Sequence, residues 1–268
     1  SATRVNSQGL IEDMQILSSN LISNGDFSQE GSQLVTNGDF ATDSNWTKQA
    51  SWSISGGAAN YDFLSDAKYI RQTLLSGGFV AGKSYKINFE ITSGTAYMYV
   101  SSNAAGLISL NTYSVGSYSI YVTASASGSD LLIYGRNTSG TAFSIDNVSV
   151  KEVGQDWTLG TGWSIGEDIA NCSGGAAQVL YQANLIPIGT QYKLTFTVSN
   201  FSQGYLSAYG GDWDAQGVIE ANGTFTIYTE KLATSNTGFV GNGFVGSITN
   251  ISLIEITDDT NLPRIDYS

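Results

Sequence analysis

Apolar and polar residues alternate with a period of two along several short stretches of the chain. Apolar side chains occupy every second position of residues 85–91 and 192–198, and polar side chains lie between them. This period is typical of a strand that buries one face. Residues 118–122 and 225–229 repeat it, and no long stretch has the period of an amphipathic helix. The pattern therefore predicts an all-β protein.

These strands belong to two copies of one module. Each copy contains a Trp-Thr pair, a Trp-Ser-Ile stretch, a Gly-Gly-Ala-Ala turn and a closing apolar strand, always in that order. The matched stretches are 45–59 with 156–177, 82–89 with 189–196, and 144–150 with 247–253. A copy spans about a hundred residues, an ordinary domain size. Several short strands in that length fit an antiparallel β-sandwich of the jelly-roll kind.

A shorter duplication precedes the first copy. Residues 21–28 and 34–41 stand close together, and both contain the sequence Asn-Gly-Asp-Phe. The first copy needs only one of them, whereas the second copy begins at Gly154 with none. The stretch 21–28 is therefore the natural candidate for the missing first strand of the second copy.

We accordingly predict that one module is inserted in a loop of the other. The inner module comprises residues 32–153, and the outer module comprises residues 19–31 plus 154–257. Such insertions are tolerated because the termini of a domain often lie close together. Residues 1–18 and 258–268 are predicted to be flanks of a larger protein. The alternative is two modules in tandem with a stuttered leader strand.

The composition limits the possible partners. With 41% hydrophobic and only 13% charged residues, each copy can bury a core of its own. The formal net charge of −12 would repel nucleic acid and an anionic membrane surface. No apolar run approaches the roughly 20 residues that a membrane-spanning helix needs. We therefore expect neither nucleic-acid binding nor membrane insertion.

The residue types also restrict the chemistry. Histidine is absent, and Cys172 is the single cysteine. Cys-His and Ser-His catalysis are therefore excluded, as is an internal disulfide. Cys172 lies in a loop-like, glycine-rich segment, so we interpret it as an incidental unpaired residue rather than a nucleophile. No cofactor for chemistry is expected.

Four features taken together resemble the family 4/9-like carbohydrate-binding modules. They are the Asn-Gly-Asp-Phe opening, a Trp several residues later, a second Trp in a Trp-Ser-Ile strand, and a closing Ile-Asp-Asn-Val-Ser-Val strand. The resemblance covers both copies and so most of the chain. It implies a jelly-roll sandwich and non-catalytic binding of a polysaccharide or cell-surface glycan.

The two flanks carry a separate resemblance. Residues 3–12 and 261–267 look like segments of bacteriophage tail-fibre and other virion-surface proteins, in which extra modules interrupt a larger polypeptide. This resemblance implies an extracellular or virion-surface location. It also implies that the chain is joined to the remainder of a larger polypeptide.

A sugar site should contain aromatic residues that the fold itself does not need. Sugars lay their apolar C–H faces on aromatic rings, while amides, carboxylates and guanidinium groups bind their hydroxyls. Aromatics at matching positions in both copies are better explained by core packing: Trp52 with Trp163, Tyr85 with Tyr192, and Phe89 with Phe196. Trp46 and Trp157 also match but stand beside a loop, so packing and binding both stay open for them.

Two pairs of strand tyrosines are candidates for that role. Tyr97 and Tyr99 alternate with small apolar residues and so share one face of a strand. Two rings at this spacing lie about 7 Å apart, which suits neighbouring sugar rings. Tyr205 and Tyr209 follow the same alternation in the second copy. The competing interpretation is that these tyrosines merely cover a sheet.

Further candidates lie in one loop and one strand. Trp213 has no counterpart in the first copy and stands in a polar loop, so it is the best single candidate for a ligand platform in the outer module. Asp212 and Asp214 would accept hydrogen bonds from sugar hydroxyls. A loop tryptophan that contacts a neighbouring domain is the alternative. In the inner module Tyr134 and Arg136 would add a ring and a donor fork, unless Arg136 is simply solvated.

The resemblance also implies a structural calcium ion between the opening and closing strands. It points to Asp39 and Asp146 in the inner module, where carboxylates and backbone carbonyls would supply the oxygen ligands that calcium requires. The outer module has Asp26 but places Thr249 where the inner module has Asp146, so its site is in doubt. A solvated aspartate in a turn is the alternative.

Three classes of function remain. Glycan binding leads, because no motif supplies an acid and a base in one pocket. A glycoside hydrolase or lyase fragment is one alternative: hydrolysis needs only two carboxylates, for which Glu90, Glu220 and Glu230 are candidates. A structural spacer or assembly domain of a fibre, without any ligand, is the other.

Overall fold

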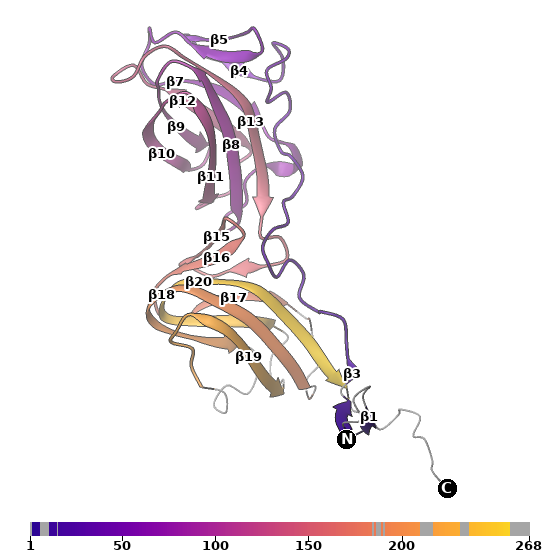
Figure 1. The fold of residues 1–268 in the computed structure, drawn as a ribbon. Coiled ribbons are helices and arrows are strands. Elements are labelled where there is room, and N and C mark those ends of the chain that lie inside the picture. Colours follow the sequence, from indigo (N-terminus) through magenta and orange to yellow (C-terminus); the bar gives the residue numbers. More distant parts are fainter. Residues whose placement is uncertain are drawn as a thin grey trace. The chain divides into compact units, whose positions relative to one another are not determined.

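The structure confirms the all-β prediction. The computed structural model describes residues 2–5, 11–14, 16–183, 185, 189, 191–209, 217–230 and 236–257 (Figure 1). This part of the chain forms antiparallel sheets, one 3-10 turn (η1, Leu75–Gly77) and no α-helix. Accordingly, no helix within these ranges is long and apolar enough to cross a bilayer.

The chain divides into two compact units. Residues 28–155 and 164–168 form one, which we call the inner unit. The described residues within 1–27, 156–163 and 169–268 form the other, the outer unit. The outer unit therefore receives segments from both sides of the inner unit in the sequence.

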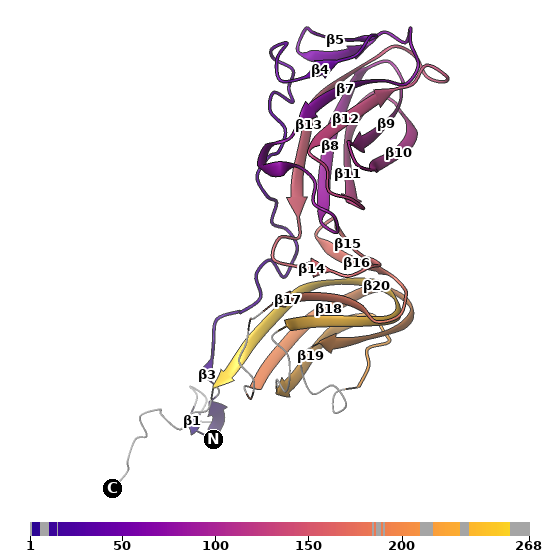
Figure 2. The same ribbon diagram turned by 180° about the vertical axis from the view of Figure 1, so that it is seen from behind.

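The inner unit contains two five-stranded sheets (Figures 1 and 2). The front sheet has the order β10-β9-β12-β7-β4 and the back sheet the order β11-β8-β13-β6-β5. The strands of the front sheet are β4 (Thr47–Lys48), β7 (Lys68–Thr73), β9 (Ala96–Ser102), β10 (Gly106–Tyr113) and β12 (Asp130–Gly135). Those of the back sheet are β5 (Trp52–Ser55), β6 (Ala58–Tyr61), β8 (Ser84–Ser93), β11 (Gly116–Thr123) and β13 (Phe143–Val153).

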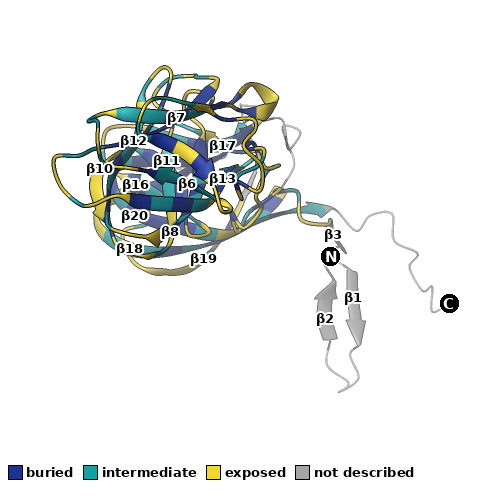
Figure 3. Ribbon diagram, turned by 90° about the horizontal axis from the view of Figure 1, so that it is seen from above, coloured by how far each residue is buried: buried dark blue, intermediate teal, exposed yellow. Residues whose placement is uncertain are grey.

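The core of the inner unit follows from the two-residue period. In β8 the buried apolar side chains are Tyr85, Ile87, Phe89 and Ile91, and the side chains between them are partly exposed. In β13 the alternation is interrupted at Asp146 and Asn147 and resumes at Val148. Figure 3 colours the strands by burial. Aromatics that match between the copies are buried in both units, which confirms their prediction as packing residues: Trp52, Trp163, Tyr85, Tyr192, Phe89 and Phe196.

The outer unit uses fewer and longer strands. The eight-stranded sheet contains β3 (Ile16–Leu17), β14 (Thr158–Leu159), β15 (Trp163–Gly166), β16 (Ile169–Ser173), β17 (Gln178–Ala183), β18 (Gln191–Tyr209), β19 (Gly223–Glu230) and β20 (Asn236–Thr257). Of β15, only Trp163 is counted with the outer unit. Strands β18 and β20 pair along nearly their whole length, with register shifts between Thr195 and Thr197, between Ser199 and Gln203, and at Tyr205. Separately, β1 (Ala2–Val5) pairs with β2 (Ile11–Met14).

The Asn-Gly-Asp-Phe sequence of the inner unit is a packing motif. The Trp46 Nε1 donates to the carbonyl of Asn37 (3.0 Å), and the Phe40 and Trp46 ring centroids lie 5.1 Å apart. The Val148 amide donates to the carbonyl of Gly38 (2.8 Å). A Cβ on Gly38 would stand 1.9 Å from the Val148 oxygen, so only glycine fits against β13 there.

The earlier Asn-Gly-Asp-Phe sequence makes the same contacts with the outer unit. The Trp157 Nε1 donates to the carbonyl of Asn24 (2.9 Å), and the Phe27 and Trp157 centroids lie 5.3 Å apart. The Ile251 amide donates to the carbonyl of Gly25 (2.9 Å), where a Cβ would stand 2.0 Å from the Ile251 oxygen. Both tryptophans are buried. These contacts are the ones expected if the inner module is inserted in a loop of the outer module. The insertion itself stays a prediction.

Candidate functional site

Three tyrosines stand in a row across the front sheet. Tyr99 of β9 lies directly opposite Tyr134 of β12, which lies directly opposite Tyr69 of β7. The Tyr99 and Tyr134 rings are stacked, with centroids 4.4 Å apart and an interplanar angle of 7°. Tyr69 meets Tyr134 edge-on at 5.2 Å and 67°. The row therefore holds the Tyr99 ring from one side.

The strand period places these rings on the outer face of the sheet. Met98, Val100 and Ile133 point into the core, so Tyr99 and Tyr134 between them point outward and are half-buried. Burial raises the pKa of both phenols, chiefly through desolvation. Both hydroxyls therefore stay protonated at neutral pH and can donate hydrogen bonds.

Strand β10 bulges where it passes Tyr99. Ile108 pairs with Val100 and Asn111 pairs with Met98, so both Ser109 and Leu110 lie opposite the single residue between those partners. A second register shift lies between Gly106 and Ile108. Bulges bend the edge of a sheet and increase its twist. Here the bent edge brings the β10 backbone beside the Tyr99 ring.

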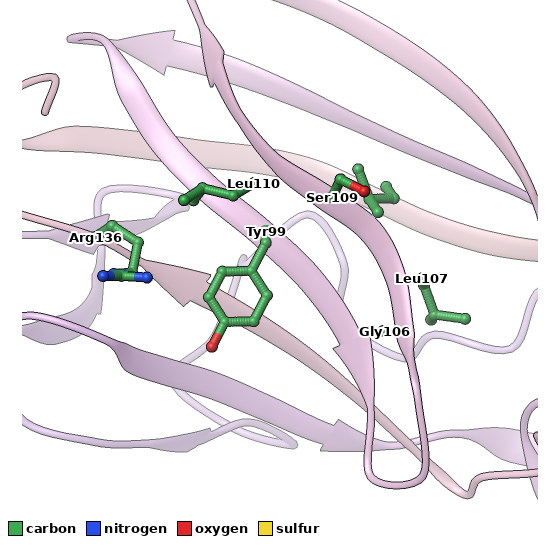
Figure 4. Close-up of a pocket in the computed structure, with 7 residues that line it drawn as sticks. Tyr99, Gly106, Leu107, Ser109, Leu110 and Arg136 are labelled. Atoms are coloured by element: carbon green, nitrogen blue, oxygen red, sulfur yellow. The ribbon is translucent and has the colours of Figure 1, made fainter.

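A pocket of about 400 Å³ lies at this edge. Figure 4 shows the side chains around the Tyr99 ring. The lining residues are Tyr99, Arg136 and the five residues of β10 from Gly106 to Leu110. Strands β10 and β12 lie on opposite sides of β9. One face of the Tyr99 ring therefore packs on Tyr134, and the other borders the pocket.

Arg136 is the one charged residue that lines the pocket, and it has a carboxylate partner. Its Nε donates to the Asp66 Oδ1 at 2.8 Å, and the Asn137 amide donates to the same oxygen at 3.0 Å. The hydrogen bond from Arg136 lowers the pKa of Asp66, and the same bond raises the pKa of Arg136. The terminal nitrogens of Arg136 make no hydrogen bond to residues that the structure describes.

Other sequence-predicted residues lie outside this pocket. Tyr97 is half-buried beside it, and its carbonyl accepts a hydrogen bond from the Arg136 amide (2.9 Å). Tyr205 is 36% exposed on β18 of the outer unit. The side chain of Tyr209 is outside the described residues, as are Trp213, Asp212 and Asp214.

No protein-family model matches the chain, and no curated protein matches it in sequence. Among solved structures, the tandem domain CBM22-1-CBM22-2 of Xyn10C from Paenibacillus barcinonensis is similar at 10% identity. That match covers 88% of this chain and 94% of the other, with a TM-score of 0.34. A fucolectin from the serum of striped bass, Morone saxatilis, is similar at 10% identity over 91% and 96%, with a TM-score of 0.26. A Paenibacillus xanthan lyase is similar at 14% identity over 80% and 24%, with a TM-score of 0.24. Similarities this distant do not indicate a function for this chain.

Among the residues that the structure describes, the outer unit has no counterpart of the tyrosine row. Gln72 exchanges two hydrogen bonds with the Thr36 backbone, and Gln182 does the same with Ser23, which aligns β7 with β17. With this alignment and the strand registers, the positions of Tyr99, Tyr134 and Tyr69 are taken by Ser207, Val240 and Val179. The two copies therefore differ where the inner unit has its pocket.

Sequence reasoning missed Tyr69, Asp66 and strand β10. Trp213 was chosen as a candidate because the other copy has no aromatic residue at the matching position. Tyr69 meets the same criterion, because Val179 occupies its position in the outer unit. Asp66 and β10 left no such signal. Asp66 meets Arg136 only through the fold, 70 residues apart, and a bulge depends on the pairing of two strands.

The predicted calcium residue Asp146 lies on β13 of the back sheet, and Asp39 lies in a turn near it. Burial raises the pKa of Asp146, and the nearby carboxylates of Glu90 and Asp39 raise it further. A cation would relieve this negative potential. However, no three His, Cys, Asp or Glu side chains of the described segments are grouped to hold a metal ion. Two aspartates supply only part of the six to eight oxygens that calcium takes, and the ion stays a prediction.

Proposed function

We propose that this chain binds glycans without altering them, through the pocket at the edge of the front sheet. The observation that carries the proposal is the Tyr99 ring, which is held on one face by Tyr134 and borders the pocket with the other. An aromatic face presented in this way accepts the apolar C–H face of a sugar ring. Because the stack already fixes the ring, little conformational entropy is lost on binding.

Polar groups around the ring support the same function. The terminal nitrogens of Arg136 donate to sugar hydroxyls, and the Ser109 hydroxyl and the β10 backbone donate or accept. The pocket volume of about 400 Å³ lies in the range of about 300–1,000 Å³ that is common for small-ligand sites. An aromatic wall with a few polar groups is the usual composition of such sites.

Binding is favoured over hydrolysis by the composition of the pocket. Glycoside hydrolases use two carboxyl groups that flank the scissile bond, and none of the seven lining residues is Asp or Glu. Among the candidate carboxylates named above, Glu90 lies on the back sheet, where its Oε2 accepts a hydrogen bond from the side-chain Nδ2 of Asn147 (2.9 Å). Glu220 is exposed in the outer unit, and the side chain of Glu230 lies outside the described residues.

The broader setting of the chain is proposed on sequence grounds alone. The flank resemblance supports an adhesion role in a bacteriophage or other virion-surface protein, outside the cell and within a larger polypeptide. The second platform around Trp213, with Tyr205 and Tyr209, is proposed in the same way for the outer unit.

Titration of soluble polysaccharides with Tyr99→Ala tests the proposal. We expect the variant to bind about 5- to 30-fold more weakly than wild type, because removal of a stacking ring costs on the order of 1–2 kcal/mol. Tyr228→Ala, which removes a 50% exposed tyrosine from the outer unit, is the matched control and should bind normally. Trp213→Ala in the same titration tests the predicted second platform.

Two results would contradict the proposal. Absence of binding to every polysaccharide of a broad panel would favour a structural spacer. Release of new reducing ends during incubation would show that the chain is a hydrolase or a lyase.

A further inference from the structure

The pocket contains an arginine, and arginine alone would favour an acidic sugar. A guanidinium group binds carboxylates and sulfates through paired hydrogen bonds. Arg136 is the one cationic residue in the lining, and its terminal nitrogens have no partner among the described residues. An unpaired arginine in this position would therefore attract uronic acids and sulfated sugars.

Asp66 changes this expectation. It is held in place by two donors, the Arg136 Nε at 2.8 Å and the Asn137 amide at 3.0 Å. The lowered pKa of Asp66 and the raised pKa of Arg136 keep both groups ionised at neutral pH. The pair therefore has no net charge, while 37% of the Asp66 side chain and 27% of the Arg136 side chain stay exposed.

The second arginine of the same face is balanced in the same way. Arg71 lies two positions after Tyr69, so both side chains point to the outer face of β7. Its Nη1 lies 3.6 Å from the Asp130 Oδ2. The tyrosine row is thus flanked by two arginines with carboxylate partners, in a chain with a net charge of −12. Among the described residues, neither of the two arginines that flank the row is therefore an uncompensated positive charge.

We propose that Asp66 determines the charge specificity of the pocket: by balancing Arg136 it makes the site accept uncharged sugars and reject sugars that carry carboxylate or sulfate groups. This inference rests on the proposed glycan-binding function. Asp66 acts through Arg136, which contacts the sugar. Charge specificity is then set by an interaction between two side chains.

Comparison of neutral and acidic polysaccharides tests the inference. The neutral probes are mixed-linkage β-glucan, arabinoxylan and galactomannan, and the acidic probes are polygalacturonate, alginate and hyaluronate. In affinity gels at equal probe concentration, wild type should be retarded by at least one neutral probe and by no acidic probe. Asp66→Asn keeps an acceptor for Arg136 but removes the charge. It should bind an acidic probe at least about tenfold more tightly than wild type, and salt should weaken that gain.

Two further variants assign the effect to the pair. Asp43→Asn removes the same charge from a surface pair with Lys48 and should gain no acidic binding. The double variant Asp66→Asn with Arg136→Gln should lose the gain. Circular dichroism and Tm establish that each variant is folded.

Different failures have different meanings. If wild type binds an acidic probe more tightly than any neutral probe, the proposed role of Asp66 is wrong. This test uses the wild-type protein alone. Equal acidic binding by Asp66→Asn and Asp43→Asn would overturn that role as well. Absence of binding to both classes of probe would instead contradict the proposed function.

Discussion

Tyr99 depends on its neighbours for its orientation. A tyrosine on a sheet surface can change rotamer, and a ring that moves freely loses entropy when a sugar stacks on it. The parallel contact with Tyr134 at 4.4 Å, and the edge contact of Tyr69 with Tyr134, restrict this motion. Tyr134 is therefore a positioning residue, which acts on the ligand through Tyr99.

This role predicts different effects for two substitutions of Tyr134. Tyr134→Ala should weaken glycan binding about 2- to 10-fold, since an aromatic pair contributes about 0.5–1.5 kcal/mol beyond its burial. Tyr134→Phe keeps the ring and should bind like wild type. Calorimetric titration of both variants is the measurement. Equal losses in both would show that the Tyr134 hydroxyl, rather than the stack, contributes to binding.

Among the elements, strand β10 shapes the pocket through its irregular pairing. Ser109 and Leu110 share a single partner position on β9, so the edge bends at the Tyr99 ring. Leu110 is 39% exposed there. A regular strand would carry the same residue types without the same bend.

Deletion of Ser109 tests the contribution of the bulge. With one residue fewer, β10 can pair regularly with β9 between Ile108 and Asn111, and the bend at the Tyr99 ring should be lost. We expect binding to fall by at least about tenfold while Tm changes by only a few degrees, because the buried side chains of β10 keep their partners. Unchanged binding in a folded deletion variant would mean that the bulge is not needed.

The closing strand β13 carries the predicted calcium residue Asp146, and its charge gives a stability prediction. The folded-state pKa of Asp146 is raised above its usual value, so the folded state binds the proton more tightly than the unfolded state. Stability from this group is present below the unfolded pKa and is lost as pH rises through the folded pKa. In EDTA at pH 7, Asp146→Asn should therefore unfold at a higher temperature than wild type.

Calcium should reverse that order. At a free concentration of a hundred times its Kd, a bound ion stabilises the folded state by about 2.7 kcal/mol, and the loss of the Asp146 carboxylate should remove most of this gain. Thermal unfolding of both proteins with calcium and with EDTA is the measurement. If calcium leaves the Tm of wild type unchanged, the site does not exist.

At the same scale, the sequence predicts strands and faces better than it predicts contacts. The alternation around Tyr99 and Tyr134 correctly places both rings on the outer face of their strands. That these rings stack, and that Tyr97 lies outside the lining, depends on the register between β9 and β12. The alternation is compatible with several registers. Tyr69 could have been predicted from the sequence, because Val179 occupies its position in the other copy. Asp66 could not, because it contacts Arg136 only in the folded chain.

Over the whole molecule, the two Asn-Gly-Asp-Phe sequences are neighbours in the chain but pack in different units. Phe40 packs on Trp46 in the inner unit, and Phe27 packs on Trp157 in the outer unit. The inner unit therefore separates Phe27 from the rest of its own core in the sequence. Replacement of Phe27 should therefore destabilise the outer unit, and replacement of Phe40 should destabilise the inner unit.

Hydrogen exchange of two variants tests this assignment. Phe27→Ala should destabilise the outer unit by about 3–5 kcal/mol and raise amide exchange in β17 and β20, with β8 and β13 unchanged. Phe40→Ala should raise amide exchange in β8 and β13 and leave exchange in β17 and β20 unchanged. Faster exchange in the inner unit of Phe27→Ala would support the tandem arrangement with a stuttered leader strand.

The central claim is that a sugar ring lies on the face of Tyr99 that Tyr134 leaves uncovered. The most direct test is a nuclear Overhauser measurement on protein with isotope-labelled tyrosine rings, in the presence of an oligosaccharide from the best-binding polysaccharide. Tyr99→Phe assigns the ring signals. We predict cross-peaks between the sugar C–H protons and the Tyr99 ring. Oligosaccharide binding with cross-peaks to other rings and none to Tyr99 would contradict the account.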